Sequence, residues 1–187
     1  MKTVFILGIS TCIILSAIPA MAHKAHVHGN AEMNLMVEDQ NVGIELISPF
    51  ANFISFEHTP ETDAEMKEIR NLVMALHQAD KLFVFPERAE CRLERVSLES
   101  EIIDDSILSL DENTQSNRER KEEHDEESHG DLKAEYSFIC EKPDNLKSVK
   151  VGLFALFPDL HEIHVQMITP KGQGAIELNA QSDRILW

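Results

Sequence analysis

The chain has 187 residues, a formal net charge of -16 at pH 7 and a hydrophobic fraction of 43 %. Its 33 acidic and 17 basic residues leave no basic surface to neutralise phosphates, so nucleic acid is excluded as a partner and anionic membranes are disfavoured. The apolar fraction is ordinary for a globular protein, so extensive disorder is not expected.

Residues 1–22 have the features of a signal peptide. Lys2 is followed by an apolar stretch over residues 4–18, and Ala20-Met21-Ala22 has the small-x-small pattern of a cleavage site. We therefore expect export and cleavage after Ala22, which leaves residues 23–187 as one mature domain. No other apolar run reaches about 18 residues, so the mature protein is not expected to be membrane-embedded.

The first predicted elements are a hairpin and a helix. Apolar residues alternate from Ala31 to Val37 and again from Val42 to Leu46, which indicates a hairpin with one buried face. Over residues 62–77 the apolar spacing changes to that of a helix, which begins with a capping box formed by Thr62 and Glu65.

Alternating apolar residues return in the second half of the chain. After a connection through Phe83, Phe85 and Pro86, we expect strands in residues 91–98 with an irregularity at Arg95, 132–140, 149–157, 163–167, 175–178 and 185–187. Seven to eight strands with one amphipathic helix predict a mainly β (α+β) fold, an antiparallel β-sandwich-like or curved sheet.

Residues 104–130 differ from the rest in composition. They hold ten acidic and three basic residues and no aromatic residue, and no aliphatic residue follows Leu110. Such a segment cannot bury enough apolar area to offset the entropy of ordering, so it is predicted to be a disordered or loosely ordered acidic insertion.

Two cysteines, Cys91 and Cys140, remain after the expected cleavage. In an oxidising compartment they are expected to form a disulfide, which joins the strand before the insertion to the strand after it. A thiol metal site or redox pair is the alternative, but it lacks the C-x-x-C spacing.

Histidines supply the candidate chemistry. On an extended chain His26 and His28 point to one side with Cα atoms about 6.6 Å apart, which gives half of a zinc site. His58, beside Glu57, is a candidate third ligand, and His124 and His129 lie among acids of the insertion. Each candidate also has a plainer interpretation. His26 and His28 could belong to a frayed terminus, His58 could be a surface histidine packed on Phe56, and His124 and His129 could lie in a solvated acidic loop.

The remaining histidines have simpler interpretations. His161 and His164 should point to opposite sides of a strand as ordinary exposed residues, and His77 should end the helix, where a positive ring suits the dipole. The chain has no H-E-x-x-H and no G-x-S-x-G motif, and neither mature cysteine has the marks of a nucleophile, so an enzyme is not expected.

Several of these motifs, taken in order, also resemble a known family, the ZrgA-like periplasmic zinc-binding proteins of Gram-negative bacteria. The residues that carry the resemblance are His26-Val27-His28-Gly29, Ala31-Glu32, Ser48-Pro49, Phe56-Glu57-His58, Cys91, Tyr136-x-Phe138-x-Cys140, Phe154, Phe157-Pro158 and Gln173. The resemblance implies a periplasmic protein that binds Zn²⁺ and assists zinc acquisition beside an inner-membrane importer, with metal at His26, His28, His58 and His129.

One departure from the family concerns the insertion. Family members often carry a long, histidine-dense segment there, whereas this chain has only His124 and His129. The departure argues against a high-capacity zinc store in the insertion, but not against a single site in which His129 or His124 completes the ligands. Lys133 also stands where a further histidine would not be surprising in such proteins.

Three rival functions remain open at this point. If His23 is the first mature residue, its amine and ring with His26 or His28 could form a brace-like site for copper. The acidic insertion could instead dock on a basic protein without any metal. A zinc hydrolase would need an open coordination position beside an acid, and nothing in the sequence favours it.

Overall fold

The described chain forms nine strands in two sheets. The computed structural model describes residues 27–109 and 130–187. The larger sheet has the order β4-β5-β2-β1-β7-β8 and is formed by β1 (Asn30–Glu38), β2 (Asn41–Pro49), β4 (Cys91–Ser100), β5 (Asp131–Cys140), β7 (Glu162–Thr169) and β8 (Gly172–Leu178). The smaller sheet has the order β3-β6-β9 and is formed by β3 (Phe83–Val84), β6 (Ser148–Val151) and β9 (Arg184–Leu186).

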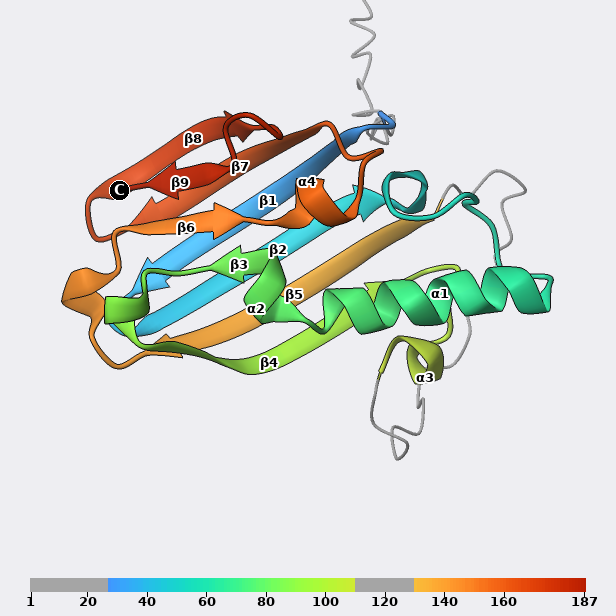
Figure 1. Cartoon of the computed structure of the whole chain (residues 1–187), viewed down its shortest axis with the longest axis horizontal. Helices are drawn as coiled ribbons and strands as arrows, with labels where there is room; N and C mark the ends of the chain where they lie inside the picture. Colours follow the sequence, from blue (N-terminus) through green and yellow to red (C-terminus); the bar gives the residue numbers. More distant parts are fainter. Residues whose placement is uncertain (1–26, 110–129) are drawn as a thin grey trace, which may run out of the picture.

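The smaller sheet and the long helix lie over one face of the larger sheet (Figure 1). The helices are α1 (Asp63–Leu76), α2 (Ala79–Leu82), α3 (Asp105–Leu108) and α4 (Leu153–Leu156), with 3-10 turns at Phe50–Asn52, Glu87–Ala89 and Pro143–Asn145. The apolar core fills the space between these layers, and the other face of the larger sheet is open. The predicted mainly β, sandwich-like fold with one long helix is confirmed.

The β1–β2 hairpin forms as its alternation predicts. Ala31, Met33, Leu35 and Val37 are each at most 5 % exposed and face the core, while the residues between them lie on the open face. Glu38 pairs with Asn41, so the turn between the strands has two residues, and the first of these, Asp39, adopts a φ of 50°. Short polar residues tolerate this left-handed conformation better than most, which suits aspartate to the turn.

One strand pair is parallel, although the other six described pairings are antiparallel. β1 runs parallel to β7, with Asn30 in register with Glu162. Parallel pairing aligns the starts of the two strands, whereas antiparallel pairing would place them at opposite ends. Residues before β1 and residues before β7 therefore meet at the same end of the sheet.

Helix α1 begins and ends as the sequence predicts. The Thr62 side chain accepts from the Glu65 N–H, and the Glu65 carboxylate accepts from the Thr62 N–H, which completes the capping box. Ile69, Leu72, Val73 and Leu76 are buried against the sheets. His77 caps the C-terminal end, and its Nδ1 lies 2.8 Å from the backbone oxygen of Val73.

The predicted disulfide is confirmed. Cys91 and Cys140 are direct neighbours in the β4–β5 pair and form a bond across 49 residues of sequence. The predicted irregularity in β4 is also confirmed, because the register shifts between Leu93 and Arg95. Since the bridge lies within a strand pair, it fixes the alignment of the two strands that precede and follow residues 101–130.

The prediction of disorder from residue 104 is wrong for its first few residues. Asp104 caps the short helix α3, with its Oδ1 accepting from the Ser106 N–H at 2.9 Å. Leu108 is 2 % exposed and joins the core, so this turn has the apolar anchor that the rest of the segment lacks. The remainder of the predicted insertion, residues 110–129, lies outside the described residues, as does the predicted signal peptide.

Across the described ranges, no helix has the length and apolar character needed to cross a membrane.

Candidate metal centre

The turn that precedes β1 is held by the buried side chain of Asn52. Its Oδ1 accepts from the Gly29 N–H at 2.6 Å, and its Nδ2 donates to the backbone oxygen of Asn30 at 2.8 Å and to Ser48 Oγ at 2.9 Å. Gly29 has a φ of +88°, a conformation that favours glycine. The backbone beside His28 is therefore fixed, although its ring is exposed.

The His28 ring lies against a carboxylate from another part of the chain. Its Nε2 is 3.1 Å from Glu57 Oε2. The other Glu57 oxygen, Oε1, accepts from the Ala51 N–H at 3.3 Å, and the Glu57 side chain is 13 % exposed against 65 % for His28. A mostly buried carboxylate, held by a backbone N–H, thus lies against an exposed imidazole, an arrangement found around histidine metal ligands.

His58 follows Glu57 and lies just before helix α1. Its Nδ1 is 2.9 Å from the backbone oxygen of Thr59, its Nε2 is 4.0 Å from Glu65 Oε1, and its ring centroid is 5.1 Å from that of Phe56. The ring is half exposed. The expected packing of His58 on Phe56 is therefore present, and the outward nitrogen is Nε2, which faces the acidic first turn of α1.

The chain that follows residue 129 returns to the same place. The Gly130 N–H donates to the backbone oxygen of Glu57 at 3.4 Å, and the Gly130 oxygen accepts from the Phe50 N–H at 3.1 Å. Gly130 is buried. This pair of hydrogen bonds anchors Gly130, at the end of the predicted insertion, to the segment from Phe50 to Glu57 that leads into His58.

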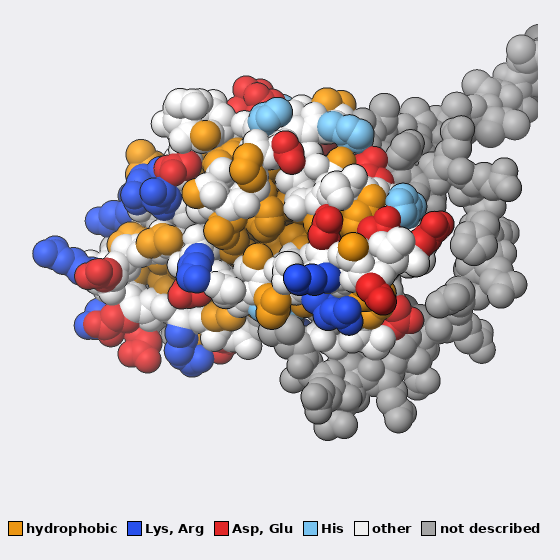
Figure 2. Space-filling view, turned by 45° about the vertical axis from the view of Figure 1, so that its right-hand side comes forward, with side chains coloured by type: hydrophobic (Ala, Val, Ile, Leu, Met, Phe, Trp, Pro, Cys, Tyr) orange, Lys and Arg blue, Asp and Glu red, His pale blue; other side chains and the backbone are white. Residues whose placement is uncertain are grey.

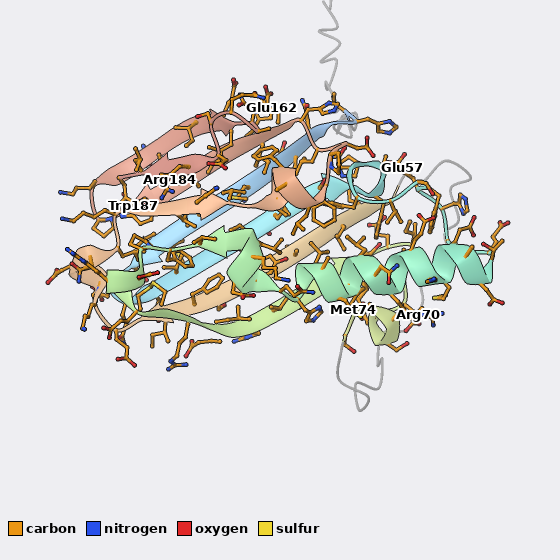
Figure 3. All side chains as sticks on the ribbon, viewed as in Figure 1. Glu57, Arg70, Met74, Glu162, Arg184 and Trp187 are labelled. Carbon is orange, nitrogen blue, oxygen red and sulfur yellow. A yellow bond between two sulfur atoms is a disulfide. The ribbon has the colours of Figure 1, made fainter. Side chains whose placement is uncertain are left out.

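The start of β7 completes this end of the sheet. The N–H groups of His161 and Glu162 both donate to the backbone oxygen of Gly29, at 2.7 and 2.9 Å. A Cβ at position 29 would lie 2.8 Å from the His161 ring, so the close approach also requires glycine there. Figure 3 shows Glu57 and Glu162 at the same end of the larger sheet. On the face drawn in Figure 2, the visible histidines lie toward one end and many lysines and arginines toward the other, while acidic side chains occur at both ends.

The five candidate ligands are only partly within the described residues. His28 and His58 are described: His28 contacts the Glu57 side chain, and His58 follows Glu57 in the chain. His26, His124 and His129 lie outside the described residues, so their part in the site stays a prediction. The described residues alone do not bring His28 and His58 into one group of three metal-binding side chains.

A different group of three does form, on the open face of the larger sheet. Glu162, His164 and Glu177 each offer one ligand atom, and these atoms lie within 4.8 Å of one another. His164 is exposed, as the sequence predicts, but sequence reasoning alone misses its two carboxylate neighbours. The sequence does contain a signal for Glu177. If Thr169 pairs with Gly172 across the turn at Pro170-Lys171, then His164, five residues before Thr169, pairs with Glu177, five residues after Gly172.

Lys133 is an ion-paired residue of the open face. Its Nζ lies 2.5 Å from Glu135 Oε1 and 3.1 Å from Glu45 Oε1. Hydrogen bonds to Glu135 and Glu45 raise the pKa of Lys133 above its usual value, and hydrogen bonds from Asn34 and Lys133 lower the pKa of Glu45. A charged ammonium has no lone pair for a metal, so this position is a fixed cation in this chain.

Nitrogen and oxygen atoms of the types that bind divalent cations lie at one end of this β-sandwich-like fold. Comparison with known families identifies the family itself. The sequence profile described as "ZrgA family zinc uptake protein" matches residues 25–187, which is nearly all of the chain outside the predicted signal peptide. The chain therefore belongs to the ZrgA family, as its resemblance to that family suggested. No curated protein matches it.

Family membership gives the chain a role in zinc acquisition. The family's description names uptake of a metal and no chemical reaction.

Proposed function

We propose that this protein is exported to the periplasm and binds Zn²⁺ reversibly there, through His26, His28 and His58, with His129 or His124 completing the site. The observation that supports this most is the hydrogen bond from Gly130 to Glu57. It anchors the residue after His129 beside the loop that carries Glu57 and His58, and Glu57 itself contacts His28.

The hydrogen bonds of the two described rings suit metal binding. An imidazole whose Nε2–H donates to Glu57 keeps the lone pair of Nδ1 for a metal, and the carboxylate fixes the orientation of the ring. In His58 the roles are reversed, because Nδ1–H donates to the Thr59 oxygen and Nε2 keeps its lone pair. Zinc takes four ligands at about 2.0 to 2.1 Å in most sites, so both rings must turn toward a common centre.

The proposal also includes the compartment in which the protein works and the partner that receives the zinc ion. The disulfide is the kind of bond that persists in an oxidising compartment, which supports a periplasmic location. The acidic residues around His124 would raise the local concentration of cations, and the histidine site would then hold the ion at a defined geometry. We include an inner-membrane zinc importer as the partner that receives the ion, in keeping with a family of uptake proteins.

The test is a zinc titration of the mature protein, residues 23–187, at pH 7.5 in competition with a chromophoric chelator. The double variant His26→Ala/His28→Ala should bind zinc at least tenfold more weakly, and His58→Ala should also lose affinity, because ligands are removed. The matched control is His77→Gln, which removes one imidazole at the far end of α1 and keeps a donor for the Val73 oxygen. Unchanged affinity in the first two variants would contradict the proposal.

Two further measurements separate the rival functions. Zinc affinity should fall between pH 7.5 and pH 5.5, because imidazoles protonate near pH 6.5 and then cannot bind metal. Equal affinities at the two pH values would exclude histidine ligation. Titration with Cu²⁺ and N-terminal sequencing of the secreted form test the copper brace, which requires His23 at the first position. Salt-sensitive binding to a protein that persists in chelator would favour the metal-free module.

A further inference from the structure

The group formed by Glu162, His164 and Glu177 lies apart from the proposed histidine site. His164 Nε2 is 3.0 Å from Glu162 Oε1, and its Nδ1 is 3.7 Å from Glu177 Oε1. Glu162 is two residues before His164 on β7, so both side chains point to the open face. Glu177 is the direct partner of His164 on β8. An imidazole is thus held between two carboxylates by strand geometry rather than by a flexible loop.

A small rearrangement would turn this group into a metal site. Four tetrahedral ligands at zinc distances are about 3.3 Å from one another, and the present ligand atoms lie within 4.8 Å. Closing the group therefore requires the most distant ligand atoms to approach one another by about 1.5 Å. One nitrogen and two carboxylate oxygens are a donor set that divalent zinc accepts in proteins, with water at the open position.

A neighbouring strand adds a third carboxylate. Glu32 on β1 stands in register with His164 on β7, so Glu32, His164 and Glu177 form a row across three adjacent strands. The alternation of β1 directs Glu32 to the open face, because Ala31 and Met33 are buried. The concentration of negative charge around one imidazole favours a bound cation over an empty site.

The surroundings favour rapid exchange of the ion. His164 and Glu177 line a groove of about 1350 Å³ on the open face, together with Gly43, Gly174 and Ala175. The side chains of Glu162, His164 and Glu177 are 37, 46 and 68 % exposed. An ion bound there would be reached from solvent, and its ligands would not be locked by burial.

We propose that Glu162, His164 and Glu177 form a second divalent-cation site, which holds Zn²⁺ more weakly and exchanges it faster than the histidine site. The two sites are joined by the backbone, because Gly29 follows His28 and accepts the N–H of Glu162. An exposed site next to a better-ligated one is suited to receive the ion before, or release it after, tight binding.

The experiment follows the histidine ring signals of the mature protein by ¹H–¹⁵N NMR during titration with Zn²⁺ alone. The variant His164→Gln identifies the His164 signals. These signals should shift with added zinc, after the first site is filled. The double variant Glu162→Gln/Glu177→Gln should weaken this response at least tenfold. The control Glu38→Gln/Glu141→Gln removes two exposed charges elsewhere and should change it less than twofold.

The outcomes separate this site from the histidine site. In His26→Ala/His28→Ala the His164 response should remain, so that it persists even if the histidine site is absent or lies elsewhere. His164 signals that stay unmoved at saturating zinc would overturn the proposal, since the ring would then serve only as an ion-pair partner of the two carboxylates. An equal loss in the control double variant would overturn it as well, because net charge alone would explain the binding.

Discussion

The backbone N–H of Gly130 donates to the backbone oxygen of Glu57, 3.4 Å away and 73 residues earlier in the chain. This contact joins the end of the predicted acidic insertion to the loop whose carboxylate orients His28. Together with the hydrogen bonds around Gly29, it makes one end of the larger sheet the meeting place of four chain segments. The rigid part of the proposed site is therefore its backbone, and the exposed imidazoles are its adjustable part.

Asn52 is expected to stabilise this end of the sheet. In Asn52→Ala, three hydrogen bonds around the turn at Gly29 are lost and buried backbone groups are left without partners, so the free energy of unfolding should fall by about 2 to 3 kcal/mol. Urea unfolding followed by circular dichroism measures the change. The matched control is Asn34→Ala, an exposed amide that donates to Glu45 and should cost less than about 1 kcal/mol. Equal losses in the two variants would contradict the role given to Asn52.

Tyr136 links the sheet to the end of helix α1. Its buried hydroxyl donates to the backbone oxygen of Leu76 at 3.1 Å. In Tyr136→Phe this carbonyl loses its partner, and the free energy of unfolding should fall by about 1 kcal/mol, measured by urea unfolding at pH 7.5. Increased stability of the variant would show that burial of the hydroxyl costs more than its hydrogen bond contributes.

The same residue should make stability depend on alkaline pH. Burial raises the pKa of Tyr136 above the usual 10.0, so the hydroxyl stays protonated in the folded protein after it would ionise in the unfolded chain. Its contribution to stability is thus fully present below pH 10 and is lost as the pH rises above it. Because the chain has one tyrosine, phenolate absorbance should appear together with unfolding. Tyr136→Phe should lose less stability than the wild type between pH 9 and pH 11.

The disulfide should contribute much of the stability of the fold. The bond between Cys91 and Cys140 closes a loop over 49 residues, which corresponds to about 4 kcal/mol in the chain-entropy description. The variant Cys91→Ala/Cys140→Ala should unfold at correspondingly lower urea concentration. Reduction of the wild-type protein serves as the control and should give a similar loss. A loss below about 1 kcal/mol in both would mean that the β4–β5 pairing alone fixes the loop.

Glu65 should make the start of helix α1 sensitive to acid. Backbone hydrogen bonds, first from Glu61 and then from Thr62, lower the pKa of Glu65 below 4.5. A lowered pKa in the folded state gives stability that is present above pH 4.5 and is lost as the pH falls through the folded value. Glu65→Gln should therefore lose less stability than the wild type between pH 5 and pH 3, measured by thermal unfolding. Glu61→Gln, which keeps the backbone donor, is the control and should behave like the wild type.

Local patterns predicted the elements whose causes lie in a few adjacent residues. The hairpin follows from the alternation of Ala31 to Leu46, and helix α1 from its apolar spacing and capping box. The pairing of Cys91 with Cys140 could be predicted because only two cysteines follow the expected cleavage site. The start of the insertion was harder to predict, since Leu108 offers a single apolar anchor whose burial depends on the neighbouring core.

The sequence predicted which histidines belong to the candidate site, but not how they are arranged in space. Nothing near Asn52 in the sequence indicates that its amide would hold the turn at Gly29, and Glu57 was noted in the sequence only as the neighbour of His58. The structure instead shows its carboxylate beside His28. Residues 23 positions apart meet only after the sheet has formed, so such contacts depend on strand order.

The sequence by itself was enough to predict an export signal, a mainly β fold with one helix, the disulfide and the residue types suited to zinc. Each of these depends on composition or on periods of two to four residues. Only the tertiary structure decided that β1 and β7 run parallel. This pairing brings His161 and Glu162 to Gly29, and it places Glu32 in one row with His164 and Glu177. Strand direction and register are set by the packing of the whole core, which no local pattern contains.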